Sequence, residues 1–120
     1  MSYRSRSHTS ANSRGHLTIG GCDTVALAKR FGTPLYVIDE DAVRHACRSY
    51  VEEFGARYPD VRVIYAGKAL MVKAVALLVM EEGLSLDVCS GGELYTAISA
   101  GCPTDRIYFH GNSKTTAEIA

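Results

Sequence analysis

Residues 61–69 read Val-Arg-Val-Ile-Tyr-Ala-Gly-Lys-Ala, an apolar run that leads directly into a lysine. β-Branched and aromatic residues of this kind favour a β-strand, and a helical pattern follows at about 70–82. The expected strand therefore delivers Lys68 to its carboxyl end, where parallel α/β folds place their working groups. Partial burial there disfavours the charged ammonium form and leaves the amine available as a nucleophile toward carbonyls. Lys68 is the candidate Schiff-base lysine.

The same strand–helix unit repeats on a short, regular period after this point. Strands are expected at about 61–66, 85–89 and 106–110, and helices at about 70–82, 91–100 and from near Ser113 onward. Such alternation indicates parallel βα units, in either a doubly wound sheet or a barrel, and the short period favours the barrel. An eight-unit barrel needs about 250 residues. The chain of 120 residues is therefore expected to be the N-terminal piece of a larger domain.

The first third of the chain has a different character. Residues 1–16 are rich in serine and arginine, and we expect them to form a disordered polar tail. A short helix at 24–31 and a strand at 34–38 should follow, and Asp39 can cap the next helix. The apolar stripe of that next helix comprises Val43, Ala46, Cys47, Tyr50, Val51 and Phe54.

Composition excludes several classes of function. The 13 basic and 13 acidic side chains balance, so electrostatics do not favour binding to nucleic acid or to an anionic membrane surface. No apolar run approaches the roughly 18 residues of a membrane-spanning helix. The four cysteines and four histidines lack metal-ligand spacing, so we expect no metal and reduced, buried thiols of a cytoplasmic protein.

Two further ionisable residues lie at the ends of expected strands. Asp87 falls near the end of the second repeated strand and His110 at the end of the third, so both should share one rim with Lys68. Placed near Lys68, Asp87 can hold the lysine charged between chemical steps. The alternative is that each is a polar residue whose hydrogen bonds are satisfied locally at a strand end.

The string Ser90-Gly-Gly-Glu93 is a capping box. In this motif the serine accepts a hydrogen bond from the backbone N–H of Glu93, and Glu93 reaches back. Gly91 and Gly92 also open a helix N-terminus, which can receive an anion. Ser113 is the expected cap of the last helix.

Three strings together carry a resemblance to a known family. Residues 65–69 (Tyr-Ala-Gly-Lys-Ala), 83–95 (Gly-Leu-Ser-Leu-Asp-Val-Cys-Ser-Gly-Gly-Glu-Leu-Tyr) and 106–114 (Arg-Ile-Tyr-Phe-His-Gly-Asn-Ser-Lys) resemble the N-terminal part of the diaminopimelate decarboxylase family. That family belongs to the fold-type III pyridoxal-phosphate enzymes, with alanine racemase and ornithine decarboxylase. The likeness runs from about Gly15 to the last residue. Many members have Asn where this chain has Leu70.

The resemblance implies a two-domain homodimeric enzyme that contains pyridoxal 5'-phosphate. Residues 39–120 would form the first βα units of an alanine racemase-like (β/α)8 barrel, and 17–38 an N-terminal segment associated with a separate β-domain, to which the strand at 34–38 would contribute. Lys68 would carry the cofactor, with Asp87 and His110 as further cofactor-binding residues. The implied reaction decarboxylates meso-2,6-diaminopimelate to L-lysine, the last step of lysine synthesis.

Two alternatives stay open at this point. One is a related decarboxylase of ornithine, arginine or carboxynorspermidine, because the specificity residues, the phosphate grip and the partner-subunit residues of the family lie downstream. The other is a non-catalytic α/β module that binds a phosphate-bearing ligand or a protein partner. Three barrel strands alone leave an open edge, so the isolated chain is expected to fold poorly and to show no turnover.

Overall fold

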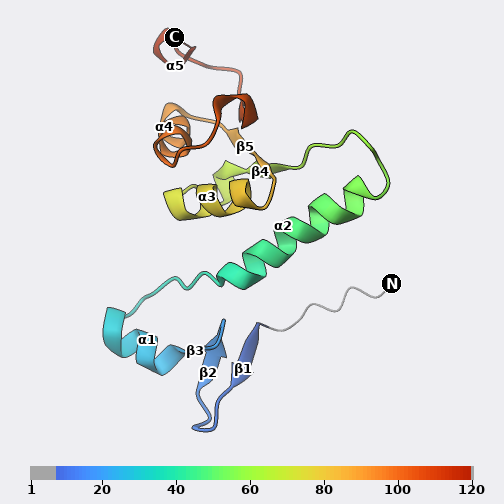
Figure 1. Ribbon diagram of the computed structural model, residues 1–120. Helices are drawn as coiled ribbons and strands as arrows, with labels where there is room; N and C mark the ends of the chain where they lie inside the picture. The colour runs from blue at the N-terminus through green and yellow to red at the C-terminus, as the bar shows by residue number, and fades with distance from the viewer. Residues whose placement is uncertain (1–7, 120) are drawn as a thin grey trace. The chain divides into compact units, whose positions relative to one another are not determined.

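The computed structural model describes residues 8–119, in two compact units that divide between Val43 and Arg44 (Figure 1). The first unit holds a three-stranded antiparallel sheet of β1 (Thr9–Ala11), β2 (Leu17–Ile19) and β3 (Cys22–Asp23), followed by helix α1 (Thr24–Phe31). Gly20 and Gly21 make the turn between β2 and β3 with φ of 54° and 77°, a region that favours glycine.

The expected disordered tail is wrong for its described part. Residues 9–11 form β1, which pairs with β2 in the register Ser10↔Thr18. The Ser10 and Thr18 hydroxyls lie 2.7 Å apart, and Thr18 is buried. Polar residues form a strand here because a neighbouring strand satisfies their backbone groups, which composition alone does not reveal. Residues 1–7 lie outside the described part of the chain.

Helix α1 has the predicted bounds, and Asp23 caps its N-terminus. The Asp23 carboxylate accepts hydrogen bonds from the backbone N–H groups of Val25 and Ala26, at 2.9 and 3.2 Å. A hydrogen bond with His16 and these backbone bonds hold the pKa of Asp23 well below its usual range. The carboxylate therefore joins the turn after β1 to the start of α1.

The predicted strand at 34–38 is absent from the structure, although these residues are described. They belong to neither of the two described sheets, and Tyr36 is 97% exposed. Local β-propensity is not sufficient here, because a strand also needs a partner for its N–H and C=O groups. Helix α2 (Glu40–Gly55) then begins as predicted, with Asp39 Oδ1 accepting from the Ala42 N–H at 3.1 Å.

Of the predicted apolar stripe on α2, only Cys47 is buried. Tyr50 and Phe54 are exposed, and their rings stack with centroids 6.4 Å apart. The periodicity therefore correctly predicts an apolar helix face, but the described residues do not cover the whole of it.

The second unit contains the predicted parallel sheet. Its strands are β4 (Ile64–Ala66), β5 (Ser85–Val88) and β6 (Ile107–Phe109), in the order β4-β5-β6. Helices α3 (Lys73–Glu81) and α4 (Gly91–Ser99) connect them, and α5 (Thr116–Ile119) follows. Two 3-10 turns, η1 (Gly67–Ala69) and η2 (Thr104–Arg106), complete the unit. The repeated βα units are confirmed, and η1 delays the start of α3 to Lys73.

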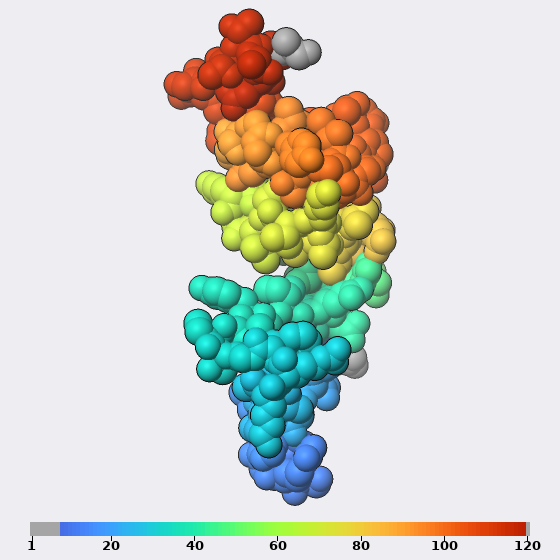
Figure 2. Space-filling model, turned by 90° about the vertical axis from the view of Figure 1, so that its left-hand side faces the viewer, coloured from blue at the N-terminus to red at the C-terminus, as the bar shows by residue number. Residues whose placement is uncertain are grey.

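The core of this unit lies between the sheet and its helices. Leu86 and Val88 of β5 are fully buried, as are Ala76 and Val79 of α3 and Ala97 of α4. Helix α3 packs against both β5 and α4, and the space-filling view shows the yellow and orange residues of this unit in continuous contact (Figure 2). Fully burying a side chain such as Leu or Val contributes about 1.5–3 kcal/mol. Because strand side chains alternate, Asp87 points to the face opposite this core.

An ionic cluster joins α2 to the end of α3. Glu82 accepts from Arg44 at 2.8 Å and from Arg48 at 2.5 Å, and its side chain is only 8% exposed. The two guanidinium groups lower the pKa of Glu82 to about 2. Arg44 also pairs with Glu81 at 2.7 Å.

Candidate active site

The carboxyl ends of the three parallel strands bring the predicted site residues to one edge of the sheet. Lys68 lies on η1, directly after β4; Asp87 is in β5; His110 follows the last residue of β6. In register, Asp87 pairs with Ala66 on one side and with Tyr108 on the other. Ala66, Asp87 and Tyr108 thus lie side by side across the sheet. Lys68 and His110 each follow this row by two residues along their own chain segments.

Gly67, which precedes the lysine, is buried and determines how closely η1 approaches β5. A Cβ atom at this position would lie 2.6 Å from the backbone oxygen of Asp87. Only glycine allows this approach, because the obstructing atom belongs to the backbone and has little freedom to move. Sequence reasoning missed Gly67 as a site residue, although a glycine at a strand end next to a candidate lysine is a usable signal.

The Lys68 side chain is exposed, so the expected partial burial is wrong. The lysine stands on a 3-10 turn beside β4, the edge strand of the sheet, and the described residues leave it uncovered. Burial at a strand end needs neighbouring strands on both sides, which the local sequence does not supply.

Asp87 pairs with His110 rather than with Lys68 in the described part of the chain. His110 Nδ1 lies 3.8 Å from Asp87 Oδ2, and the two side chains are 68% and 25% exposed. This is an ion pair when the imidazole is protonated. The predicted proximity of Asp87 to the lysine therefore rests on the backbone register of β4 and β5.

Cys89 is a neighbour that sequence reasoning did not place in the site. Its Sγ lies 3.6 Å from His110 Nδ1, and its backbone N–H donates to Glu93 Oε2 at 2.6 Å. Cys89 and Cys22 are exposed, against the expectation that the thiols are buried. That expectation holds for Cys47 and Cys102, whose thiol pKa values are raised by burial.

The predicted capping box is half formed. Ser90 Oγ accepts from the Glu93 N–H at 3.2 Å, as expected. Glu93 reaches back one residue further than the motif requires, to the N–H of Cys89. Glu93 thereby fixes the backbone at the end of β5 as well as the start of α4.

The N-terminus of α4 already binds a carboxylate. The Gly91 N–H donates to Glu118 Oε1 at 3.0 Å, so a side chain of the protein itself occupies the anion position expected at Gly91 and Gly92. Hydrogen bonds from Thr115 and Gly91 lower the pKa of Glu118. Thr115 also caps α5 by accepting from the Glu118 N–H at 3.3 Å, so the predicted cap at Ser113 is wrong by two residues.

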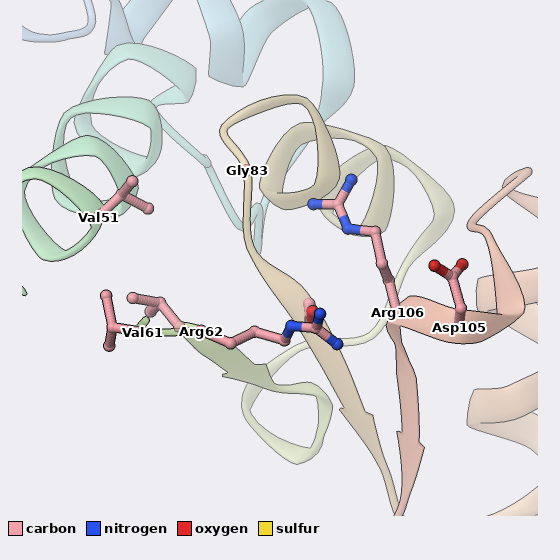
Figure 3. A pocket seen from close by; sticks show the side chains of 8 residues that line it. Val51, Val61, Arg62, Gly83, Asp105 and Arg106 are labelled. Carbon is pink, nitrogen blue, oxygen red and sulfur yellow. The ribbon is translucent and has the colours of Figure 1, made fainter. Parts of the chain in front are cut away.

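A pocket of about 240 Å³ opens at the opposite edge, among residues that precede the strands (Figure 3). Its two guanidinium groups are already bound within the fold. Arg62 donates to the Tyr108 hydroxyl at 2.7 Å, and Arg106 donates to the carbonyls of Met80 and Leu84. Parallel α/β folds rarely place chemistry at the amino ends of their strands. This pocket is therefore separate from the candidate site.

Comparison with known proteins identifies the family. A family model described as "Pyridoxal-dependent decarboxylase, pyridoxal binding domain" matches residues 40–120. The chain belongs to this family. The chain is also 50% identical over 111 residues to a diaminopimelate decarboxylase of Bacillus methanolicus, covering 92% of this chain and 26% of that protein. Over 108 residues it is 50% identical to the Bacillus subtilis (strain 168) protein of the same name, covering 90% and 25%.

Solved structures agree with this family assignment. A crystal structure titled diaminopimelate decarboxylase from "m. jannaschi" matches with a TM-score of 0.80 and 34% identity, covering 93% of this chain and 26% of that chain. The predicted fold class, the N-terminal part of a pyridoxal-binding α/β barrel, is thereby confirmed. The chain spans about a quarter of the length of these relatives. Within residues 8–119, no helix is long and apolar enough to cross a membrane.

Proposed function

We propose that the protein, at the length of its relatives, is a pyridoxal-phosphate-dependent decarboxylase that converts meso-2,6-diaminopimelate to L-lysine and carbon dioxide. One observation carries the proposal: the sheet delivers Lys68 to the carboxyl edge beside Asp87 and His110, in a chain 50% identical to diaminopimelate decarboxylases. A solved relative titled as a complex with L-lysine further supports this substrate class.

The residues at this edge fit the cofactor. An exposed primary amine can bond to the aldehyde of pyridoxal phosphate, and the open edge leaves access to it. When bound, the cofactor supplies an electron sink for the carbanion that remains after carbon dioxide leaves. Lys68 Nζ would bind the cofactor covalently and carry a proton between steps.

Asp87 and His110 would act as a proton-holding pair beside the lysine. Their nearest polar atoms, His110 Nδ1 and Asp87 Oδ2, lie 3.8 Å apart. The negative charge on Asp87 would also stabilise the ammonium form of Lys68 when the amine is free. Gly67 and Glu93 would position these groups, because they set the backbone of η1 and of the end of β5.

The domain layout also belongs to the proposal. Residues 39–120 would form the first βα units of the barrel, and the segment before them would belong to a separate β-rich domain. The antiparallel sheet β1–β3 and the division of the chain after Val43 support this arrangement. We further propose a cytoplasmic homodimer, and the four free cysteines suit a reducing compartment.

The related decarboxylases of ornithine, arginine and carboxynorspermidine are the second candidate function, and they share the lysine chemistry. The names of the curated relatives favour diaminopimelate. Assaying the full-length protein with each amino acid separates the two candidates. Turnover of ornithine or arginine in preference to diaminopimelate would refute the substrate part of the proposal and leave the lysine part intact.

The decisive experiment tests the lysine. The full-length protein is incubated with pyridoxal phosphate, reduced with borohydride and digested for mass spectrometry. We expect a pyridoxyl group on Lys68, loss of this group and of turnover in Lys68→Ala, and retention of both in the matched control Lys73→Ala. Lys73 is exposed and begins α3, five residues away. An unmodified Lys68 in the folded protein would leave the non-catalytic binding module as the better explanation.

A further inference from the structure

Asp87, Cys89 and His110 form a cluster of three potential metal ligands. Their ligand atoms all lie within 4.8 Å of one another, and they offer one carboxylate, one thiol and one imidazole. The thiol has no role in the function proposed above. Their spacing along the chain does not reveal a metal site, because Asp87 lies in β5, Cys89 follows the last residue of β5, and His110 follows β6, 21 residues after Cys89.

The sheet itself builds this cluster. Asp87 lies in β5 and Cys89 directly follows its last residue. Because the two residues are two positions apart along an extended chain, their side chains point to the same face. The parallel register Val88↔Phe109 continues one step to place His110 beside Cys89. Each backbone position is also held: the His110 N–H donates to the Val88 carbonyl at 2.9 Å, and the Cys89 N–H donates to Glu93 at 2.6 Å.

Two of the three ligand separations are close to those around a tetrahedral ion. Bond lengths of about 2.3 Å to sulfur and about 2.1 Å to nitrogen or oxygen separate tetrahedral zinc ligands by roughly 3.6 Å for a sulfur–nitrogen pair and roughly 3.4 Å for a nitrogen–oxygen pair. The observed separations are 3.6 Å for Cys89 Sγ to His110 Nδ1 and 3.8 Å for His110 Nδ1 to Asp87 Oδ2. The third pair, Cys89 Sγ and the Asp87 carboxylate oxygen, lies within 4.8 Å, so the Asp87 side chain must move closer to bind the same ion.

The donor set selects the kind of metal. Thiolate and imidazole suit Zn²⁺ and Co²⁺, whereas Mg²⁺ and Ca²⁺ require oxygen ligands. Cys89 and His110 are exposed, so an ion can reach both donors. Three protein ligands leave the fourth tetrahedral position open to water.

We propose that Asp87, Cys89 and His110 together bind one Zn²⁺ ion in the cofactor-free protein. Binding releases the Cys89 thiol proton to solvent and forms bonds to Sγ, to Nδ1 and to a carboxylate oxygen of Asp87. No electron is transferred. The inference rests on these three side chains and does not depend on the reaction proposed above.

Cobalt provides the test, because Co²⁺ occupies zinc sites and a thiolate ligand gives it a charge-transfer absorption band. The full-length protein, freed of cofactor, is titrated with Co²⁺ and then with Zn²⁺. We expect a thiolate band that saturates at one equivalent and disappears when Zn²⁺ is added. Cys89→Ser should abolish the band. His110→Gln should weaken Co²⁺ binding at least about tenfold, because mutating even a residue that only hydrogen-bonds to a metal ligand typically lowers metal affinity by about that factor.

Cys22→Ser is the matched control, because Cys22 is the other exposed free cysteine. It should leave the band and the affinity unchanged. Circular dichroism establishes that each variant is folded. Should Cys89→Ser unfold, His110→Gln decides the matter, since that side chain is two-thirds exposed and outside the core. A folded protein without a thiolate band, a band that survives in Cys89→Ser, or His110→Gln with unchanged affinity would each overturn the proposal.

Discussion

Replacing Gly67 by alanine should weaken the fold and the site together. The new Cβ would lie 2.6 Å from the Asp87 carbonyl oxygen, whereas ordinary contact begins at 3.4 Å, so the η1 and β5 backbones must separate by about 0.8 Å. Overpacking of this kind costs about 1–3 kcal/mol. The displaced backbone carries Lys68 on one side and Asp87 on the other, so the separation also disturbs the spacing of the proposed catalytic groups.

Urea denaturation and turnover measure the two effects on the full-length protein. We expect Gly67→Ala to lose about 1–3 kcal/mol in its free energy of unfolding and to lower kcat. Gly55→Ala is the control: that glycine ends α2, and an added Cβ would meet nothing within 4 Å. If Gly67→Ala matches the parent protein in both stability and kcat, then the close approach of η1 to β5 is not required, and the reasoning fails.

Three further predictions test other parts of the structure. The pKa of Glu82 is lowered to about 2, so the stability that its carboxylate contributes is complete above pH 4.5, the ordinary pKa of a glutamate, and is lost as pH falls toward 2. Melting curves should therefore show Glu82→Gln less stable than the parent protein at pH 7, with the difference shrinking below pH 4.5. A difference that stays constant with pH would contradict this. Leu86→Ala should cost about 2–5 kcal/mol of unfolding free energy in urea titrations, because a fully buried side chain leaves a cavity; a loss below 1 kcal/mol would show that β5 is not central to the core. Brief treatment with iodoacetamide should modify Cys22 and Cys89 ahead of the two buried cysteines, as peptide mass spectrometry can show, and equal labelling of all four would contradict the burial seen in the fold.

The alternation of strands and helices could be predicted because it depends on local patterns. Apolar runs of four to six residues, each followed by a helical stripe and a glycine, correctly indicated β4, β5 and β6 and the helices between them. The bounds of α1 and the cap at Asp39 were predictable for the same reason, because they depend on neighbouring residues, whereas the equally local cap at Asp23 was not predicted. The errors arose where pairing with a distant segment decides the outcome: residues 9–11 gained a partner strand, and residues 34–38 did not.

The candidate site divides in the same way. Lys68, Asp87 and His110 could be placed on one edge from sequence, because parallel strands end together and each residue follows a recognisable strand. The pairing of Asp87 with His110, the proximity of Cys89, and the need for glycine at position 67 depend on distances between strands. Side-chain exposure behaves likewise, since whether Lys68 or Cys89 is covered depends on which segments pack beside it.

Local residue order therefore accounts for the parallel βα architecture and for the lysine at a strand end, because hydrophobic period, capping and strand propensity act over a few residues. Packing in three dimensions selects the partners of each polar group, because hydrogen bonds and ion pairs form only within about 4 Å. In this sheet, the register of β4, β5 and β6 determines which atoms come that close. Position 67 shows the difference most clearly. A Cβ there would meet the flexible end of Met71, four residues along the chain, but the atom that cannot move aside is a backbone carbonyl 20 residues later, which only the packing of η1 on β5 brings near.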